Sequence, residues 1–186
     1  MMLSETTHKP TIDCEPLLIV VMGVSGTGKS TLAYEFSQRY QFIYIDADSF
    51  HSKQAIQQMS QGIPLTNEQR LPWIKRISQQ LIKYRRQNKN CILAYSGLKK
   101  VHRDIIFSSY TKNLGVLLNA DPKLIAERLN LRSDHFMSSK LLDNQFAEME
   151  PFEDDKLLLE LDITHSIDEL LKQMQTCVSK RYKNHK

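Results

Sequence analysis

A glycine-rich segment near the amino terminus has the residue types and spacing that bind a nucleotide phosphate. It fills every fixed position of the pattern G-x-x-x-x-G-K-[ST] with Gly23, Val24, Ser25, Gly26, Thr27, Gly28, Lys29 and Ser30, followed by Thr31. In such a loop the backbone N–H groups turn inward around a phosphate, and the N-terminus of the next helix adds partial positive charge. Lys29 would bridge the β- and γ-phosphates, and Ser30 would ligate Mg²⁺. The segment therefore predicts binding of a nucleoside triphosphate.

The phosphate loop leaves the reaction open, because switches, motors and small-molecule kinases all carry one. A GTPase switch also needs D-x-x-G and N-K-x-D motifs. No aspartate is followed three positions later by glycine, and the sole Asn-Lys pair, Asn88-Lys89, has cysteine where the aspartate is needed. A motor ATPase carries paired acids at the end of an apolar strand, whereas the corresponding run here ends in Tyr95-Ser96. These absences favour a small-molecule kinase.

Two aspartates follow the apolar run Phe42–Ile45. Side chains at positions i and i+2 of an extended chain project to one side, so the carboxylates of Asp46 and Asp48 can face one site. In a parallel α/β sheet that site lies beyond the carboxyl ends of the strands, at the edge that also carries the phosphate loop. Asp46 would hold Mg²⁺ through water, and Asp48 would accept a proton from the hydroxyl that attacks the γ-phosphorus. The alternative is a turn whose aspartates cap the following helix.

Cationic side chains gather in the non-strand segments that this topology would place around the site. They are Arg70, Lys99, Lys100, Arg103, Arg128 and Arg132. Some would neutralise charge on the transferring phosphoryl group, and others would bind a carboxylate or phosphate of the acceptor. The i, i+4 spacing of Arg128 and Arg132 favours a catalytic lid role for this pair. For each cation the alternative is a solvated surface charge.

Two histidines and the single tryptophan also have structural interpretations. His51 and His135 lie near turns, where a histidine more often forms a structural hydrogen bond than carries a proton. Trp73 is expected in the core of the substrate-side helices rather than stacked on a ligand.

Five apolar runs separated by helix-like stretches predict the scaffold that positions these residues. The runs are Leu17–Met22, Phe42–Ile45, Cys91–Tyr95, Leu114–Leu118 and Leu157–Ile163. The first is apolar throughout, as in a strand buried on both faces of a parallel sheet. Helix starts are readable at Asp121 before Pro122 and at the capping box Ser166 to Glu169. The alternation predicts a three-layer α/β/α fold with a parallel five-stranded sheet.

Length and composition are those of one globular domain. The 186 residues are 41% apolar and 25% charged. We expect a tail over 1–16, a kinase domain over 17–178 and a basic tail over 179–186. Two long polar intervals, Ser49–Trp73 and Asn130–Glu153, predict a substrate segment at about 49–75 and a lid at about 130–150.

Charge, cysteine usage and hydropathy exclude several classes of protein. The net charge of +4 is mild and spread along the chain, which argues against a nucleic-acid partner and admits an anionic small substrate. The three cysteines form no CxxC pair, as expected in a reducing compartment. No run of 18 apolar residues occurs and residues 1–15 lack a signal-peptide centre, so we expect no membrane partner and a cytoplasmic location.

Several linked motifs resemble those of bacterial-type gluconokinases, small phosphate-loop kinases that phosphorylate D-gluconate at its 6-hydroxyl with ATP. The matching stretches, spread over residues 17–174, are MGVSGTGKST, DADSFH, MSQGIPL, RLPW, SGLKKVHRD, and RLNLRSDHF leading to LLDNQFAEMEP. The resemblance implies a Mg²⁺-dependent homodimer of carbohydrate metabolism. The residues that it places around the sugar acid are Asp48, His51, Arg70, Lys99 and Arg103. Those that it places in the lid are Arg128, Arg132 and His135.

The chain departs from the gluconokinase pattern mainly in the acceptor segment. The departures there are Ala47 for glycine, Ser52 for proline, Ala55 for asparagine, Gln58 for lysine, and Asn67 and Gln69 for acidic residues. If Ala55 or Gln58 stands where a substrate contact is needed, each lost hydrogen bond to a charged group would cost about 1.5–3 kcal/mol. The open alternatives are another sugar acid, a shikimate-kinase-like acceptor, and a nucleotide-binding protein with a decayed acceptor site.

Overall fold

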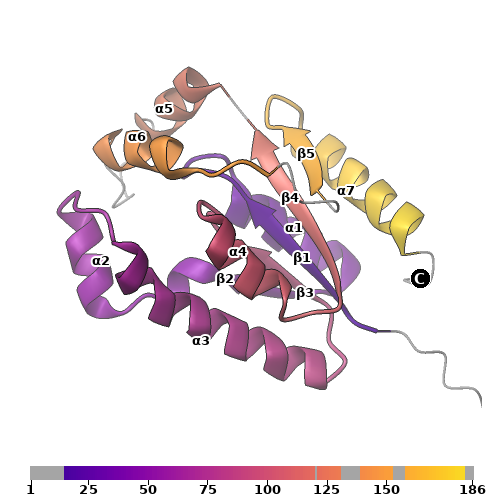
Figure 1. Cartoon of the computed structure of the whole chain (residues 1–186). Helices are drawn as coiled ribbons and strands as arrows, with labels where there is room; N and C mark the ends of the chain where they lie inside the picture. The colour runs from indigo at the N-terminus through magenta and orange to yellow at the C-terminus, as the bar shows by residue number, and fades with distance from the viewer. Residues whose placement is uncertain (1–14, 120, 131–138, 153–157, 183–186) are drawn as a thin grey trace, which may run out of the picture.

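Five parallel strands form a sheet in the order β2-β3-β1-β4-β5 (Figure 1). The structure is a computed structural model that describes residues 15–119, 121–130, 139–152 and 158–182. The strands are β1 (Leu17–Met22), β2 (Ile43–Asp46), β3 (Cys91–Ala94), β4 (Lys112–Asn119) and β5 (Leu158–Asp162). The helices are α1 (Lys29–Tyr40), α2 (Lys53–Ser60), α3 (Asn67–Arg86), α4 (Lys100–Phe107), α5 (Pro122–Asn130), α6 (Ser139–Glu148), α7 (Ile167–Arg181) and the short 3₁₀ helix η1 (Ala47–Phe50).

The central strand β1 is buried along its whole length because helices cover both faces of the sheet. Its alternate residues Leu17, Ile19 and Val21 pack with α1 and α7. Leu18 and Val20 pack on the opposite face with α3 and α4. Figure 1 shows these helix pairs on either side of the sheet. The predicted three-layer fold and its five parallel strands are therefore confirmed.

Local hydrogen bonds explain where the helices begin. The predicted capping box at α7 is confirmed, because Ser166 accepts from the Glu169 N–H and the Glu169 carboxylate accepts from the Ser166 N–H. The Lys123 N–H donates to Asp121 Oδ1 at 2.8 Å, which confirms the predicted start of α5. Helix α7 ends at Arg181, and the last of its residues buried in the core is Val178.

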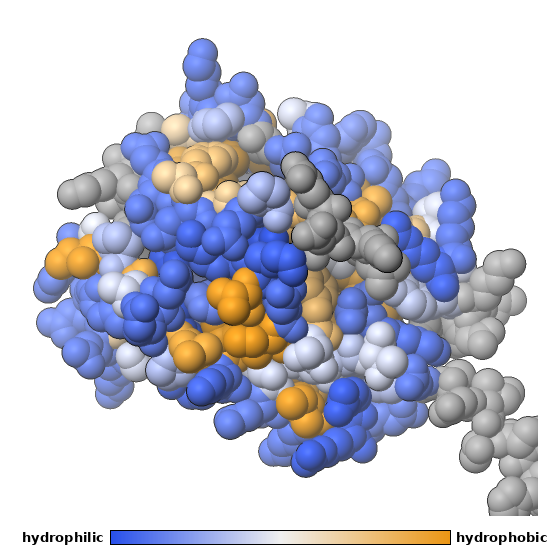
Figure 2. Space-filling view, viewed as in Figure 1, coloured by the Kyte–Doolittle hydropathy of each residue, from blue (hydrophilic) through white to orange (hydrophobic). Residues whose placement is uncertain are grey.

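The surface in Figure 2 is largely hydrophilic and is broken by small apolar patches. Across the part of the chain that the structure describes, no helix combines the length and the apolar character that a membrane crossing requires.

Candidate active site

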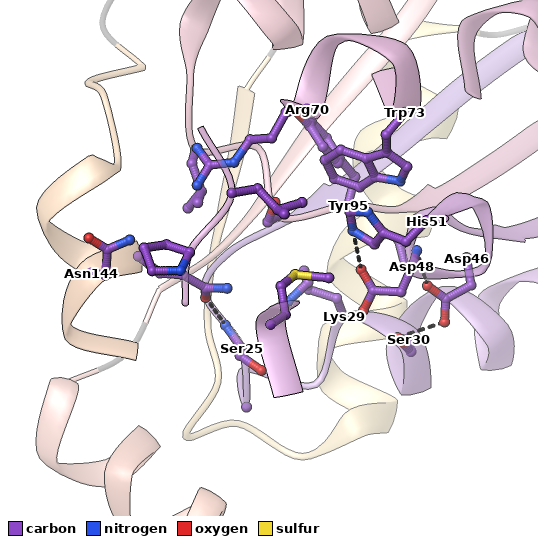
Figure 3. Close-up of a pocket in the computed structure, with 18 of the residues that line it drawn as sticks. Ser25, Lys29, Ser30, Asp46, Asp48, His51, Arg70, Trp73, Tyr95 and Asn144 are labelled. Atoms are coloured by element: carbon purple, nitrogen blue, oxygen red, sulfur yellow. Dashed lines mark hydrogen bonds and ion pairs between the residues drawn. The ribbon is translucent and has the colours of Figure 1, made fainter. Parts of the chain in front are cut away.

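A cavity opens at the carboxyl ends of β1, β2 and β3, where the predicted site residues converge (Figure 3). The phosphate loop forms one wall, and η1 with Asp48 and His51 forms another. The loop between α2 and α3, the first turns of α3 and the middle of α6 complete the lining. The cavity therefore joins the nucleotide segment to the predicted substrate segment.

The phosphate loop connects β1 to α1 and adopts backbone conformations that glycine favours. Gly23 has φ 142°, and a Cβ there would lie 3.0 Å from the Leu118 carbonyl oxygen, so any larger residue would be strained at this position. Lys29 is the first residue of α1, and its ammonium donates to the Val24 carbonyl at 2.9 Å. This contact holds the Lys29 charge over the loop, beside the N-terminus of α1.

Asp46 serves both as a helix cap and as a member of the site. Its Oδ1 accepts from the Asp48 N–H at 3.0 Å and so caps η1, the structural role considered for these aspartates. Its Oδ2 accepts from the Tyr44 hydroxyl at 3.1 Å and from Ser30 Oγ at 3.4 Å. Burial, followed by the charge of Asp46, raises the pKa of Tyr44 to about 12. The cap thus places one Asp46 oxygen beside Ser30, the other predicted metal ligand.

Asp48, on η1, and His51, the residue that follows this helix, line the cavity together with Lys29 (Figure 3). The His51 Nε2 lies 3.9 Å from Asp48 Oδ1, and the imidazole stacks on Trp73 with ring centroids 4.1 Å apart. Burial, and then the charges of Arg76 and Arg70, lower the pKa of His51 to about 4. His51 is therefore neutral at pH 7. Its Nδ1 is buried and has no hydrogen-bond partner within the described ranges.

We expect acid to destabilise the fold through His51. In the unfolded chain its pKa is about 6.5, so between pH 6.5 and about 4 the unfolded state binds more protons and stability falls as pH falls. From pH 7 to pH 5 this loss is about 2 kcal/mol. His51→Phe keeps a ring against Trp73 and should remove this part of the pH dependence. Urea unfolding of both proteins at the two pH values measures it, and equal pH dependence would contradict it.

Trp73 is buried as predicted, with 5% of its surface exposed, yet it also lines the cavity. Its Nε1 donates to the Ala47 carbonyl at 2.7 Å, which fixes the indole against η1. Tyr95 packs beside it, with ring centroids 5.6 Å apart. Trp73 is therefore both a core residue and part of the cavity wall.

Arg70 is the predicted acceptor cation that reaches the cavity. It projects from α3 into the lining, and its side chain is 11% exposed (Figure 3). Its Nη2 lies 2.6 Å from Glu148 Oε2, at the end of α6. Lys99 is outside the lining, and its ammonium pairs with Glu150 at 3.3 Å.

Arg103 lies within the protein rather than along the cavity. It is 1% exposed, and its guanidinium donates to the carbonyls of Gly97, Leu98, Glu150 and Pro151 at 2.6–3.3 Å. The guanidinium also lies 4.0 Å from the centroid of the Phe152 ring. Arg103 is buried on α4, where the carbonyls of two chain segments need donors. Arg103 thus ties the loop after β3 to the segment after α6.

Removal of Arg103 is expected to destabilise the protein strongly. In Arg103→Ala the four carbonyls lose a buried charged donor, so we expect a loss of about 3–5 kcal/mol in the free energy of unfolding. Urea denaturation measures this. Lys100→Ala is the matched control, because the Lys100 ammonium pairs with Asp104 at an exposed surface. This substitution should lower the free energy of unfolding by less than about 1 kcal/mol. Equal effects of the two substitutions would contradict the role of Arg103.

The predicted lid residues are only partly covered by the structure. Arg128 lies on α5, outside the cavity lining, and its Nη2 donates to the Ile163 carbonyl at 3.1 Å. Arg132 and His135 lie outside the described residues, as does most of the first half of the predicted lid.

Three of the departures from the gluconokinase pattern, Ala55, Gln58 and Gln69, lie outside the cavity lining. The amides of Gln58 and Gln69 exchange two hydrogen bonds, at 3.2 and 3.1 Å, and neither residue lines the cavity. Gln69 also completes the capping box of α3 with Thr66. Ala55 packs against a small apolar cluster with Met59. The described contacts of these residues are with neighbouring protein groups.

Residues of α6 that the sequence analysis did not single out also line the cavity. Asn144 and Gln145 face it, and the Gln145 Oε1 accepts from the Ser25 N–H of the phosphate loop at 2.7 Å (Figure 3). The only sequence signal for these two residues is that they lie in LLDNQF, part of a stretch that resembles gluconokinases.

Comparisons with known proteins agree with this geometry. A family model described as an AAA domain matches residues 18–152. The thermosensitive gluconokinase of Escherichia coli (strain K12) is 34% identical over 160 residues, which cover 86% of each chain. A gluconokinase of Arabidopsis thaliana is 37% identical over 153 residues, 75% of this chain and 81% of its own. Among solved structures, a gluconokinase from Sinorhizobium meliloti 1021 superposes with a TM-score of 0.80 at 30% identity, covering 91% of this chain and 95% of its own. An unliganded sugar kinase from Janibacter sp. HTCC2649 gives 0.84 at 31% identity, with coverages of 88% and 95%.

Proposed function

The chain belongs to the gluconokinase family, and from that premise we propose that it transfers the γ-phosphoryl group of ATP to the 6-hydroxyl of D-gluconate. One observation carries the proposal: a single cavity contains the phosphate loop with Lys29, the carboxylate of Asp48 and the guanidinium of Arg70. These are the groups needed to bind a triphosphate, to receive a hydroxyl proton and to bind a sugar acid.

The acceptor would lie between η1 and α3. Asp48 projects into the cavity from η1, so we assign it as the base that takes the proton of the attacking hydroxyl. The neutral His51, which lines the cavity, would hydrogen-bond another hydroxyl of the polyol. Arg70 would bind the acceptor carboxylate, because a guanidinium matches the geometry of that group.

ATP would bind along the phosphate loop, with the Lys29 ammonium turning from the Val24 carbonyl to the β- and γ-phosphates. The donor chemistry of Ser30 and Asp46 fits Mg²⁺, which prefers oxygen ligands and commonly takes one or two from the protein. When bound, Mg²⁺ supplies positive charge opposite the phosphoryl oxygens. Arg128, Arg132 and His135 stay proposals for the lid.

The position of the transferred phosphate tests this function. Incubation of the enzyme with Mg²⁺-ATP and ¹³C-labelled gluconate should give ADP and one phosphate ester, with phosphorus coupling to carbon 6 in the NMR spectrum. An ester at another carbon would mean that gluconate binds in the cavity in a different orientation. If the folded protein, with its cavity intact, forms no ester from gluconate, the proposed function is contradicted.

We also propose that the enzyme is a cytoplasmic homodimer. The family resemblance supports the dimer. The free thiols of Cys91 and Cys177 agree with a reducing compartment.

A further inference from the structure

Helix α6 touches both halves of the cavity with one face. Gln145 and Glu148 are three residues apart on this helix, so their side chains project from the same side. Gln145 reaches the phosphate loop, and Glu148 reaches the predicted acceptor cation on α3. A single helix therefore contacts the nucleotide side and the acceptor side together.

Each contact places an oxygen atom of α6 beside a group that a substrate would use, by a hydrogen bond at Gln145 and by an ion pair at Glu148. The Gln145 Oε1 accepts from the Ser25 N–H at 2.7 Å, and inward N–H groups of this loop are phosphate donors. The Glu148 carboxylate lies 2.6 Å from the Arg70 guanidinium, where the carboxylate of a sugar acid would bind. The amide oxygen thus stands in for a phosphoryl oxygen, and the carboxylate stands in for that of the acceptor.

The end of α6 is fixed immediately after these two residues. The Glu150 N–H donates to the Leu98 carbonyl at 2.8 Å, and the Glu150 carboxylate accepts from the Lys100 N–H at 2.6 Å. Two of the four carbonyl contacts of Arg103, those with Glu150 and Pro151, hold the same segment. Because this end is held, movement of α6 that separates Gln145 and Glu148 from their partners would be a rotation about it.

We infer that α6 couples the binding of the two substrates, with Glu148 as a built-in competitor of the acceptor carboxylate and Gln145 as a competitor of the nucleotide. The inference rests on the proposed function. Binding of either substrate displaces one contact and turns α6 away from the cavity. The second substrate then meets a donor that is already released, so it binds more tightly.

Electrostatics favours competition over shared binding at Arg70. The Arg70 side chain is 11% exposed and that of Glu148 is 25% exposed, so water screens their charges poorly. A second carboxylate on the same guanidinium would lie close to Glu148 and be repelled by it. Loss of the Glu148 charge should therefore strengthen acceptor binding, whereas loss of a positioning residue would weaken it.

Fluorescence of Trp73 gives a direct binding measurement, because it is the only tryptophan in the chain and lines the cavity. Gluconate is titrated with and without Mg²⁺ and a non-hydrolysable ATP analogue. In the natural protein we expect the analogue to tighten gluconate binding by about tenfold, within the usual range of coupling. By reciprocity gluconate should tighten binding of the analogue by the same factor.

Glu148→Gln preserves the shape of the side chain and removes its charge. We expect it to bind gluconate about tenfold more tightly without nucleotide and to reduce the coupling to within about twofold. Asp143→Asn is the matched control, because it removes one negative charge from an exposed position of the same helix and should behave as the natural protein. Gln145→Leu should reduce the coupling from the nucleotide side.

The outcomes separate the two proposals. Failure of the natural protein to bind or phosphorylate gluconate would overturn the proposed function and this inference with it. If the natural protein phosphorylates gluconate but Glu148→Gln binds it more weakly or with unchanged coupling, the function stands and the competitor role of α6 is overturned. A gain in affinity shared by Asp143→Asn would also overturn it, because general charge would then be the cause.

Discussion

Asp48→Asn is expected to lower kcat with gluconate by about 10²–10⁴-fold, the usual contribution of a general base. The amide keeps the size of the side chain and its place on η1 but cannot take the proton of the attacking hydroxyl. Because the Asp48 N–H, rather than its carboxylate, bonds to Asp46, the local fold should persist. Steady-state ADP release at saturating ATP and gluconate measures the change.

Asp104→Asn provides the control for this substitution. Asp104 is also an exposed aspartate, but it pairs with Lys100 on α4 and does not line the cavity. We expect its kcat to stay within about twofold of the natural value. A kcat for Asp48→Asn in that same range would show that another group accepts the proton.

Lys29→Met is expected to lower kcat/KM by at least about 10²–10³-fold, because it removes a preorganised cation from the developing charge on the phosphoryl group. Methionine retains much of the aliphatic stem, so α1 should begin at the same residue. The structure places the Lys29 ammonium 2.9 Å from the Val24 carbonyl, within the loop itself. Initial rates over a range of ATP concentrations separate the effect on kcat from that on KM.

Lys172→Met is the matched control for Lys29, because Lys172 lies on the exposed face of α7, remote from the loop. Its rates should equal those of the natural protein. Phosphoryl transfer that persisted in Lys29→Met would mean that the loop binds its nucleotide in another way than the motif predicts.

The scaffold was predictable because its signals are local. The run from Leu17 to Met22 is apolar in every residue and is followed by a glycine, a pattern typical of a strand covered on both faces. The phosphate loop is a contiguous motif, so its position after β1 and before α1 followed directly. The capping pattern from Ser166 to Glu169 likewise lies within four residues.

The rest of the site depends on partners that are distant in the sequence. Arg103 resembles a pocket cation in its segment, but carbonyls 47 and 48 residues away fix it in the interior. In the sequence, Gln58 and Gln69 are two separate replacements of charged residues. In the structure their amides form two hydrogen bonds with each other. Glu148 carries no motif of its own and gains meaning only from its contact with Arg70. Sequence spacing contains no information on such tertiary contacts.

The most direct test of the central claim is acceptor-dependent ADP release by the natural protein with Mg²⁺-ATP. D-gluconate, shikimate and related sugar acids are compared at equal concentration, with a reaction that lacks acceptor as the baseline. We predict that gluconate raises ADP release far above this baseline and that shikimate does not. Turnover that is equal with and without gluconate, in a protein that binds ATP, would contradict the assignment of this cavity as the active site of a gluconate kinase.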